Sequence, residues 1–183
     1  MKIDIYSKLN NNGERMSFQC FCDLSPFLST GFLSSLEMSG CIGEKSGWKE
    51  NYFIGDDDSF SYLFEKSHSY GEYIFDWAWA QAFERYGKVY FPKLTSMIPF
   101  TPATTPHFTT KYDEHIASHF SFYQENNYSS LHYLFATNEE KKLFEDNNFL
   151  IRDSFQYHFI NDNYQCFDDF LVALKARKAK QIR

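Results

Sequence analysis

Apolar and polar residues alternate in short runs along much of this chain, a pattern typical of strands that bury one face in a sheet. The segments 2–7, 48–54 and 60–66 show this pattern, and the polar run Gly55-Asp56-Asp57-Asp58 separates the last two. A β-hairpin is therefore predicted at 48–66. Similar alternation predicts further strands at 94–100, 131–136 and 149–160.

Helical signals separate these strands. After Ser25-Pro26, apolar residues recur every fourth position from Leu28 to Leu36, and Gly40 provides a natural end. Thr137 to Glu140 has the sequence of a capping box, which predicts that a helix begins there. The other predicted helices cover 76–86, 112–125 and 168–183, while the proline-containing segment 101–106 predicts a loop. This order predicts an α/β domain, α+β mixed, with one mixed central sheet flanked by helices.

Composition narrows the class of protein. The 183 residues suit one domain, 43% apolar and 23% charged residues indicate a globular chain, and a net charge of −6 argues against general nucleic-acid binding. The N-terminus lacks the long apolar run of a signal peptide or membrane span, so a cytoplasmic location is expected. Cys20 and Cys22 are the one close cysteine pair, and reduced thiols are expected.

Aromatic residues make up 20% of the chain, and their main role is interpreted as core packing. The alternative is a surface for stacking sugars or bases. The residues expected on apolar faces are Phe27, Phe32, Phe64, Phe83 and Phe120.

The segment 66–80, KSHSYGEYIFDWAWA, closely resembles a signature of the FemAB-like, peptidoglycan biosynthesis/recognition family of the acetyltransferase (GNAT) superfamily. Three further stretches resemble the same family in the same order. They begin at Pro26-Phe27-Leu28-Ser29, at Tyr90-Phe91-Pro92-Lys93-Leu94 and at Phe167-Asp168-Asp169-Phe170-Leu171. The resemblance covers almost the whole chain.

The resemblance implies a tandem acetyltransferase-like protein about twice as long as this chain. Residues 1–165 would form its N-terminal acetyltransferase-like (GNAT) domain, and residues 166–183 would start a basic helix leading to a second domain absent from this sequence. The implied activity is transfer of an acyl or aminoacyl group to a cell-wall precursor or related amine, with this chain as the acceptor-recognising half. The alternative is a non-catalytic binding or scaffold domain for a peptide, a glycan precursor or a partner protein.

The sequence argues against coenzyme A binding by this half. Acetyltransferases hold the pyrophosphate with a glycine-rich turn at a helix N-terminus, because inward-pointing N–H groups need space there. Residues 101–111 contain no glycine and two prolines. No cofactor is therefore expected on this chain, and an acyl-CoA or aminoacyl donor would belong to the full-length protein.

The loop after the second strand of the predicted hairpin carries the candidate substrate site, because ligand loops follow strand ends in α/β folds. The loops 66–77 and 100–104 are expected to converge on one pocket. A polar loop whose groups bond within their own turn is the alternative. The candidate substrate-binding residues are Lys66, Ser67, His68, Ser69, Tyr70, Gly71, Glu72, Asp76, Trp77, Lys93, Thr101 and Thr104.

No catalytic residue is assigned from the sequence. His68 is the first candidate for proton chemistry, with Glu72 or Asp76 to orient it, although Asp76 also suits a helix N-cap. His115 and His119 have the i, i+4 spacing of a metal pair but lack a third ligand, so no metal is expected. Ser67 and Ser69 lack the glycine elbow of a hydrolase nucleophile.

Overall fold

The computed structural model describes residues 2–9 and 25–183 of the chain. These residues form two compact units, 1–149 and 150–183, which are described separately. Cys20 and Cys22 lie outside the described residues. Cys41 and Cys166 are free thiols, as expected from the sequence.

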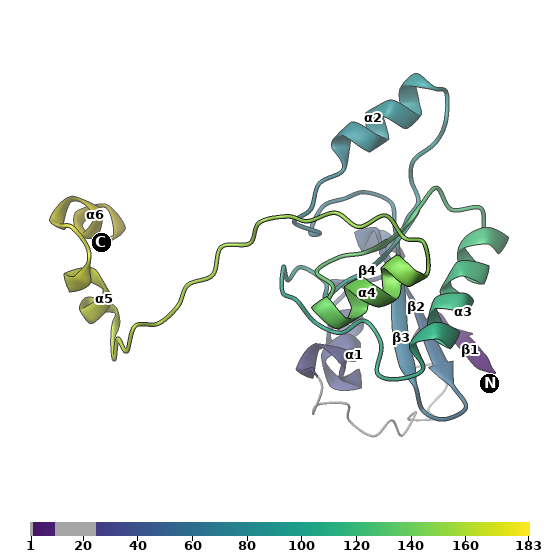
Figure 1. The fold of residues 1–183 in the computed structure, drawn as a ribbon, viewed down its shortest axis with the longest axis horizontal. Helices are drawn as coiled ribbons and strands as arrows, with labels where there is room; N and C mark the ends of the chain where they lie inside the picture. The colour runs from purple at the N-terminus through teal and green to yellow at the C-terminus, as the bar shows by residue number, and fades with distance from the viewer. Residues whose placement is uncertain (1, 10–24) are drawn as a thin grey trace. The chain divides into compact units, whose positions relative to one another are not determined.

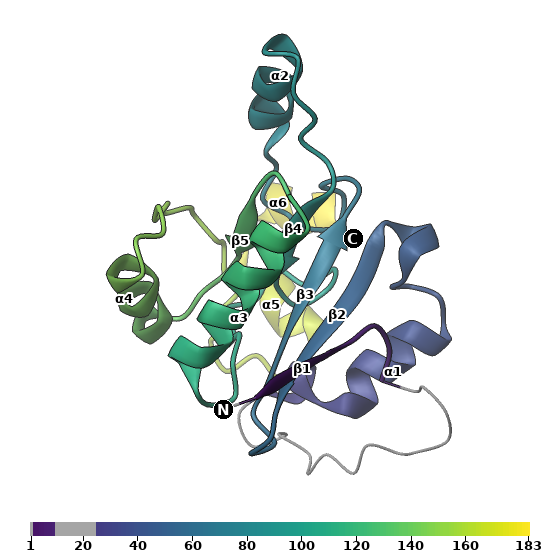
Figure 2. The same ribbon diagram turned by 90° about the vertical axis from the view of Figure 1, so that its right-hand side faces the viewer.

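The first unit is built on a five-stranded mixed sheet with the strand order β1-β2-β3-β4-β5 (Figures 1 and 2). Neighbours among the first four strands are antiparallel, and β5 runs parallel to β4. The strands are β1 (Ile3–Tyr6), β2 (Trp48–Gly55), β3 (Phe60–Lys66), β4 (Lys93–Ser96) and β5 (Leu131–Tyr133). The prediction of a mixed sheet flanked by helices is confirmed.

The hairpin β2–β3 is confirmed, with Trp48 opposite Lys66 and Ile54 opposite Phe60. Strands β4 and β5 are shorter than predicted. Strand β4 ends at Ser96, and the chain then turns at Pro99, which lacks an N–H donor, and Phe100, which has a φ of 59°. Strand β5 stops before Phe135, which has a φ of 61°, so its backbone leaves the ladder geometry.

The described residues of this unit form four helices, and the ends of these helices carry recognisable signals. Ser29 accepts a hydrogen bond from the backbone N–H of Phe32, and Gly40 leaves the first helix with a φ of 71°. The Thr137–Glu140 capping box is confirmed. The helices are α1 (Thr30–Met38), α2 (Trp77–Arg85), α3 (Tyr112–Glu125) and α4 (Asn138–Asp146), with 3-10 turns η2 (Pro26–Leu28) and η3 (Glu44–Ser46).

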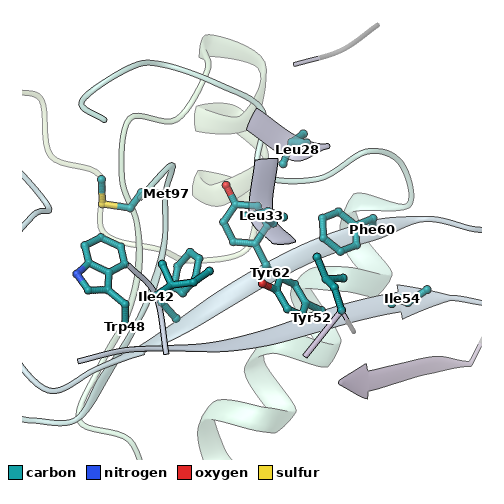
Figure 3. Close-up of a cluster of buried hydrophobic side chains, with 11 residues drawn as sticks. Leu28, Leu33, Ile42, Trp48, Tyr52, Ile54, Phe60, Tyr62 and Met97 are labelled. Atoms are coloured by element: carbon teal, nitrogen blue, oxygen red, sulfur yellow. The ribbon is translucent and has the colours of Figure 1, made fainter. Parts of the chain in front are cut away.

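Both faces of the sheet are covered. On one face, Leu28 and Leu33 from the η2–α1 segment contact Tyr52, Tyr62 and other inward-facing side chains of β2 and β3 (Figure 3). On the other face, Phe122 and Tyr123 of α3 pack against the buried side chains of Phe53, Leu63 and Leu94. Alternate residues of one strand thus enter two different cores.

Of the phenylalanines predicted to lie in the core, some are buried, some are partly buried and one is exposed. Phe64 is fully buried, Phe32 packs against the main core, and Phe27 and Phe83 are partly buried. The assignment of Phe120 was wrong, because its side chain is 46% exposed. Helix α3 turns His115, Ile116 and His119 inward, and Phe120 follows on the solvent side.

Helix α2 differs from the other helices of the unit. It has no buried residue, and both ribbon views show it standing off one end of the sheet (Figures 1 and 2). The chain reaches it through the loop 67–76, which follows β3 directly. This loop contains the segment singled out in the sequence.

The second unit consists of an irregular extended segment and two short helices. The strand predicted at 149–160 is wrong: these residues have no strand structure, and Phe155 and Tyr157 are 99% and 100% exposed. An alternating pattern becomes a strand only when a neighbouring edge accepts its hydrogen bonds, and no described strand pairs with this segment. The helix predicted from 168 is divided into α5 (Phe167–Ala173) and α6 (Ala176–Ile182) by extended backbone at Leu174 and Lys175.

No helix among residues 2–9 and 25–183 has the length and apolar character needed to cross a bilayer.

Candidate functional site

Three residues lie side by side across one end of the sheet. Trp48 of β2 is opposite Lys66 of β3, and Lys66 is opposite Lys93 of β4, so all three project from the same face. The Nζ atom of Lys66 lies 3.4 Å from the centroid of the Trp48 ring, a cation–π arrangement. Both lysines are buried, with exposed fractions of 0% and 1%. Buried cations require compensating groups.

The loop after β3 supplies those groups. Nζ of Lys93 lies 2.8 Å from Oε2 of Glu72 and 2.5 Å from Oδ2 of Asp76. Asp76 also accepts hydrogen bonds from the hydroxyl groups of Ser69 and Tyr90. The loop 66–77 is therefore tied to β4 through a buried network of charges.

Asp76 occupies the N-cap position of α2, as the sequence suggested, but its side chain makes no capping hydrogen bond. Its carboxylate points to Lys93 instead, while its backbone carbonyl accepts from the N–H groups of Trp79 and Ala80. The expected N-cap position is thus confirmed, without a side-chain hydrogen bond to the helix end. An ion pair with a buried lysine is stronger than a hydrogen bond to a solvent-accessible helix end.

The network shifts the ionisation of its members. Burial lowers the pKa of Lys66 to about 7, against the attraction of Glu72. Burial raises the pKa of Glu72, although Lys93 and Lys66 oppose that shift. Burial also disfavours the Asp76 carboxylate, but hydrogen bonds from Lys93 and the two hydroxyl donors hold its pKa below the usual range. Oε1 of Glu72 is buried and has no hydrogen-bond partner among the described residues.

Two members of the network, Tyr90 and His132, were missed by sequence reasoning. The Tyr90 hydroxyl lies 3.3 Å from Nε2 of His132, and that nitrogen lies 2.7 Å from Oγ of Ser130. Burial and the charge of Lys93 lower the pKa of His132 to about 4. Tyr90 precedes β4 and His132 lies in β5, so only the pairing of these strands brings them to the loop.

Above the buried network, the loop exposes a group of rings that we call the aromatic surface: Tyr70, Phe75 and Trp77. These side chains are 64%, 56% and 41% exposed. The ring centroids of Tyr70 and Trp77 lie 5.4 Å apart, and Phe75 stacks on Trp77 at 5.7 Å with an interplanar angle of 11°. Exposed aromatic groups of this kind are enriched at recognition sites.

Gly71 allows the loop to pack closely at this point. Its φ is +82°, and a Cβ atom there would lie 2.8 Å from Phe100 and 3.0 Å from Trp48. Only glycine combines this conformation with this approach. The loops 66–77 and 100–104 therefore meet at Gly71 and Phe100.

The other substrate-binding candidates from the sequence are divided between the buried network, the backbone of neighbouring loops and the surface. Nε2 of His68 lies 3.1 Å from the carbonyl of Ser46, and its Nδ1 accepts from the N–H of Tyr70, so both ring nitrogens bond to backbone rather than to Glu72 or Asp76. Thr101 donates to the carbonyl of Pro99. Ser67 and Thr104 are exposed, whereas Ser69, Glu72 and Lys93 are buried together.

A second buried polar network lies on the opposite face of the sheet. Oγ of Ser61 lies 2.7 Å from Nδ1 of His115 and 2.9 Å from Nε2 of His119, and His119 also contacts the hydroxyl of Tyr133 at 2.8 Å. The two histidines are thus neighbours, as their spacing suggested. No group of three or more histidine, cysteine or acidic side chains that could hold a metal ion occurs in the described part of the chain.

These histidines should make the fold sensitive to acid. Burial lowers the pKa of His115 to about 4, from an ordinary value of 6.5, and lowers that of His119 further. Between pH 6.5 and pH 4 the unfolded chain therefore binds protons that the folded chain does not. The free energy of unfolding should fall as the pH falls through this window, by about 1–3 kcal/mol for His115, and His119 should act in the same direction.

Urea unfolding at stepped pH values will measure this slope. In a His119→Gln variant the decline should be shallower than in the unmodified protein. Equal slopes in the two proteins would show that His119 does not contribute to the acid response.

The fold and site together describe a mixed α/β protein whose strand-end loop combines a buried ion-pair network with exposed aromatic rings. The family model for FemAB-like proteins, described as peptidoglycan biosynthesis/recognition, matches residues 13–183. The chain therefore belongs to the FemAB-like family. Comparisons with curated proteins and with solved structures find no match.

Proposed function

We propose that this chain is the acceptor-recognising half of an acyl- or aminoacyl-transferase-like protein that acts on a cell-wall precursor. The observation that carries the proposal is the aromatic surface, held by the ion pairs of Lys93 with Glu72 and Asp76. The family match to peptidoglycan biosynthesis/recognition supports the class of ligand.

The chemistry of the surface suits a glycan-peptide. Sugar rings present C–H groups on one face, and aromatic rings provide apolar walls against which such faces can pack. Tyr70, Phe75 and Trp77 form a continuous series of ring contacts over the loop. Because Asp76 and Glu72 fix both halves of that loop to Lys93, little ordering of the backbone would accompany binding.

The topology of the sheet supports an acetyltransferase-like assignment. A single parallel pair, β4 and β5, closes an otherwise antiparallel sheet, and α3 lies in the connection between them.

We propose further that the donor is held by another part of the full-length protein. The helix after β4 is α3, whose N-cap residue, Lys111, has a φ of 54° and makes no side-chain capping hydrogen bond. Its first turn carries Asp113 and Glu114. These two acidic side chains would repel a pyrophosphate at that helix end. Pro102 and Pro106 also lack N–H groups that could bind it.

A non-catalytic binding or scaffold role is the second candidate. It is favoured because the acidic side chains of the site, Glu72 and Asp76, are both already paired with Lys93 and so are not free to act as a general base. A general base must be within reach of the proton that it removes. Measuring acyl or aminoacyl transfer by the full-length protein separates the two candidates. Transfer supports the transferase, and ligand binding without transfer supports the binding or scaffold role.

Substitution of Trp77 or Tyr70 by alanine should weaken binding of a soluble muramyl pentapeptide by about tenfold each, because central aromatic anchors dominate such contacts. Calorimetric titration measures the affinity. Tyr86→Ala, at the far end of α2, is the matched control, because Tyr86 is 82% exposed and lies outside the aromatic surface. Equal affinities of Trp77→Ala, Tyr70→Ala and Tyr86→Ala would contradict the proposed site.

A further inference from the structure

A groove of about 710 Å³ lies beside the sheet face that α1 covers. It is bounded by the end of β1, helix α1, η3 and the start of β2. Its lining includes three carboxylates, Glu37, Glu44 and Glu50, and three lysines, of which Lys8 and Lys45 are exposed. It shares no lining residue with the aromatic surface. The groove is therefore a separate place in the first unit.

Glu50 is the unusual residue of this groove. Its side chain projects from β2 toward the face covered by α1 and is only 4% exposed. Its Oε2 atom is buried and has no hydrogen-bond partner among the described residues. Gly43 lies next to this oxygen and has no side chain to contact it: a Cβ atom added to Gly43 would be 4.0 Å from Oε2. The charges of Lys8 and Lys49 attract the Glu50 carboxylate, but no described group donates a hydrogen bond to its Oε2 atom. A buried carboxylate oxygen without a donor is expensive to maintain, so this oxygen points to a missing cationic donor.

A second carboxylate shares the groove. Oε1 of Glu37 accepts a hydrogen bond from the N–H of Leu9 at 3.2 Å. The charge of Glu37 adds to the effect of burial in raising the pKa of Glu50, which shows that the two groups lie close enough to repel each other. A cation placed between them would relieve that repulsion.

The chemistry of the lining selects the kind of cation. A multivalent metal would need more ligands than these, and no group of three or more histidine, cysteine or acidic residues suited to a metal occurs in the described ranges. A primary ammonium group carries one positive charge and three N–H donors, which two carboxylates can accept. The exposed Lys8 and Lys45 provide positive charge for a carboxylate elsewhere on the same ligand.

We infer that this groove binds the primary ammonium group of an amino-acid or peptide ligand between Glu37 and Glu50, with Lys8 and Lys45 attracting its carboxylate. The inference stands independently of the proposed function, because it rests on different residues and needs no transfer reaction. The ammonium can come from an α-amino group or from a lysine-type side chain.

Calorimetric titration of the full chain with four probes tests the inference: L-lysine, Nα-acetyl-lysine, Nε-acetyl-lysine and diacetylated lysine. L-Lysine and at least one of the two monoacetylated probes should bind, and the monoacetylated probe that binds identifies the amine. Diacetyl-lysine should not bind, because it retains the carboxylate but has no ammonium.

Glu50→Gln keeps the shape of the side chain and removes its charge, and should weaken binding at least about tenfold. Glu44→Gln is the matched control, because Glu44 is an exposed acid that also lines the groove. If Glu50→Gln does not fold, Glu37→Gln should show the same loss. Unchanged affinity in the Glu37 or Glu50 variant, or no binding of any amine probe at about 1 mM, would overturn the inference.

Discussion

Replacement of Lys93 by methionine is expected to lower the free energy of unfolding by about 3–5 kcal/mol, because it removes one partner of a buried ion pair and leaves the other charges unpaired. Glu72 is fully buried, and Lys93 is the ion-pair partner of both Glu72 and Asp76. Methionine matches the apolar stem of lysine, so loss of packing contributes little. Urea unfolding monitored by circular dichroism gives the value.

Two comparisons separate charge from packing. In Lys93→Met combined with Glu72→Gln and Asp76→Asn, much of the lost stability should return, because the two carboxylates that lost Lys93 are replaced by neutral amides. Lys49→Met breaks the partly exposed pair with Glu65 and should cost about 1 kcal/mol or less. A loss for Lys93→Met as small as that for Lys49→Met would show that the network does not hold the loop.

Trp48→Ala is expected to lower the free energy of unfolding by a similar amount, about 3–5 kcal/mol, through loss of buried area and the cavity left behind. The ring is 1% exposed and contacts Phe64 and Phe100 at centroid distances of 5.4 Å and 4.8 Å. It also lies under Nζ of Lys66. The substitution therefore removes both core packing and a contact of a buried cation.

The consequences of Trp48→Ala should extend to the aromatic surface, because Trp48 lies directly against Gly71 in the loop. Binding of the muramyl pentapeptide should weaken even under conditions where the variant remains folded. Trp48→Phe, which keeps an aromatic ring, should lose less stability than Trp48→Ala. Tyr86→Ala should change stability by no more than about 0.5 kcal/mol, since its ring is exposed. Full stability of Trp48→Ala would mean that the loop is anchored elsewhere.

Local signals predicted the hairpin, α3 and the α4 capping box because each depends on residues close in the sequence. Period-two alternation placed β2 and β3, and Thr137 with Glu140 placed the start of α4. The same alternation failed at 149–160, because a strand also requires a partner edge. The break at Leu174 was missed because neither glycine nor proline marks it.

The sequence alone determined the family resemblance and identified 66–80 as the candidate site segment, because both depend on residues that are consecutive in the chain. Whether its polar residues reach a ligand was decided by the tertiary structure. Register across β2, β3 and β4 aligned Trp48, Lys66 and Lys93 in one row, and burial of that row drew Glu72 and Asp76 inward, leaving the aromatic rings outside. His68, the first candidate in the sequence, bonds instead to the backbone of Ser46 and Tyr70. Strand pairing joins residues that are distant along the chain, and a buried lysine takes the nearest carboxylates because an unpaired charge in the interior is unstable.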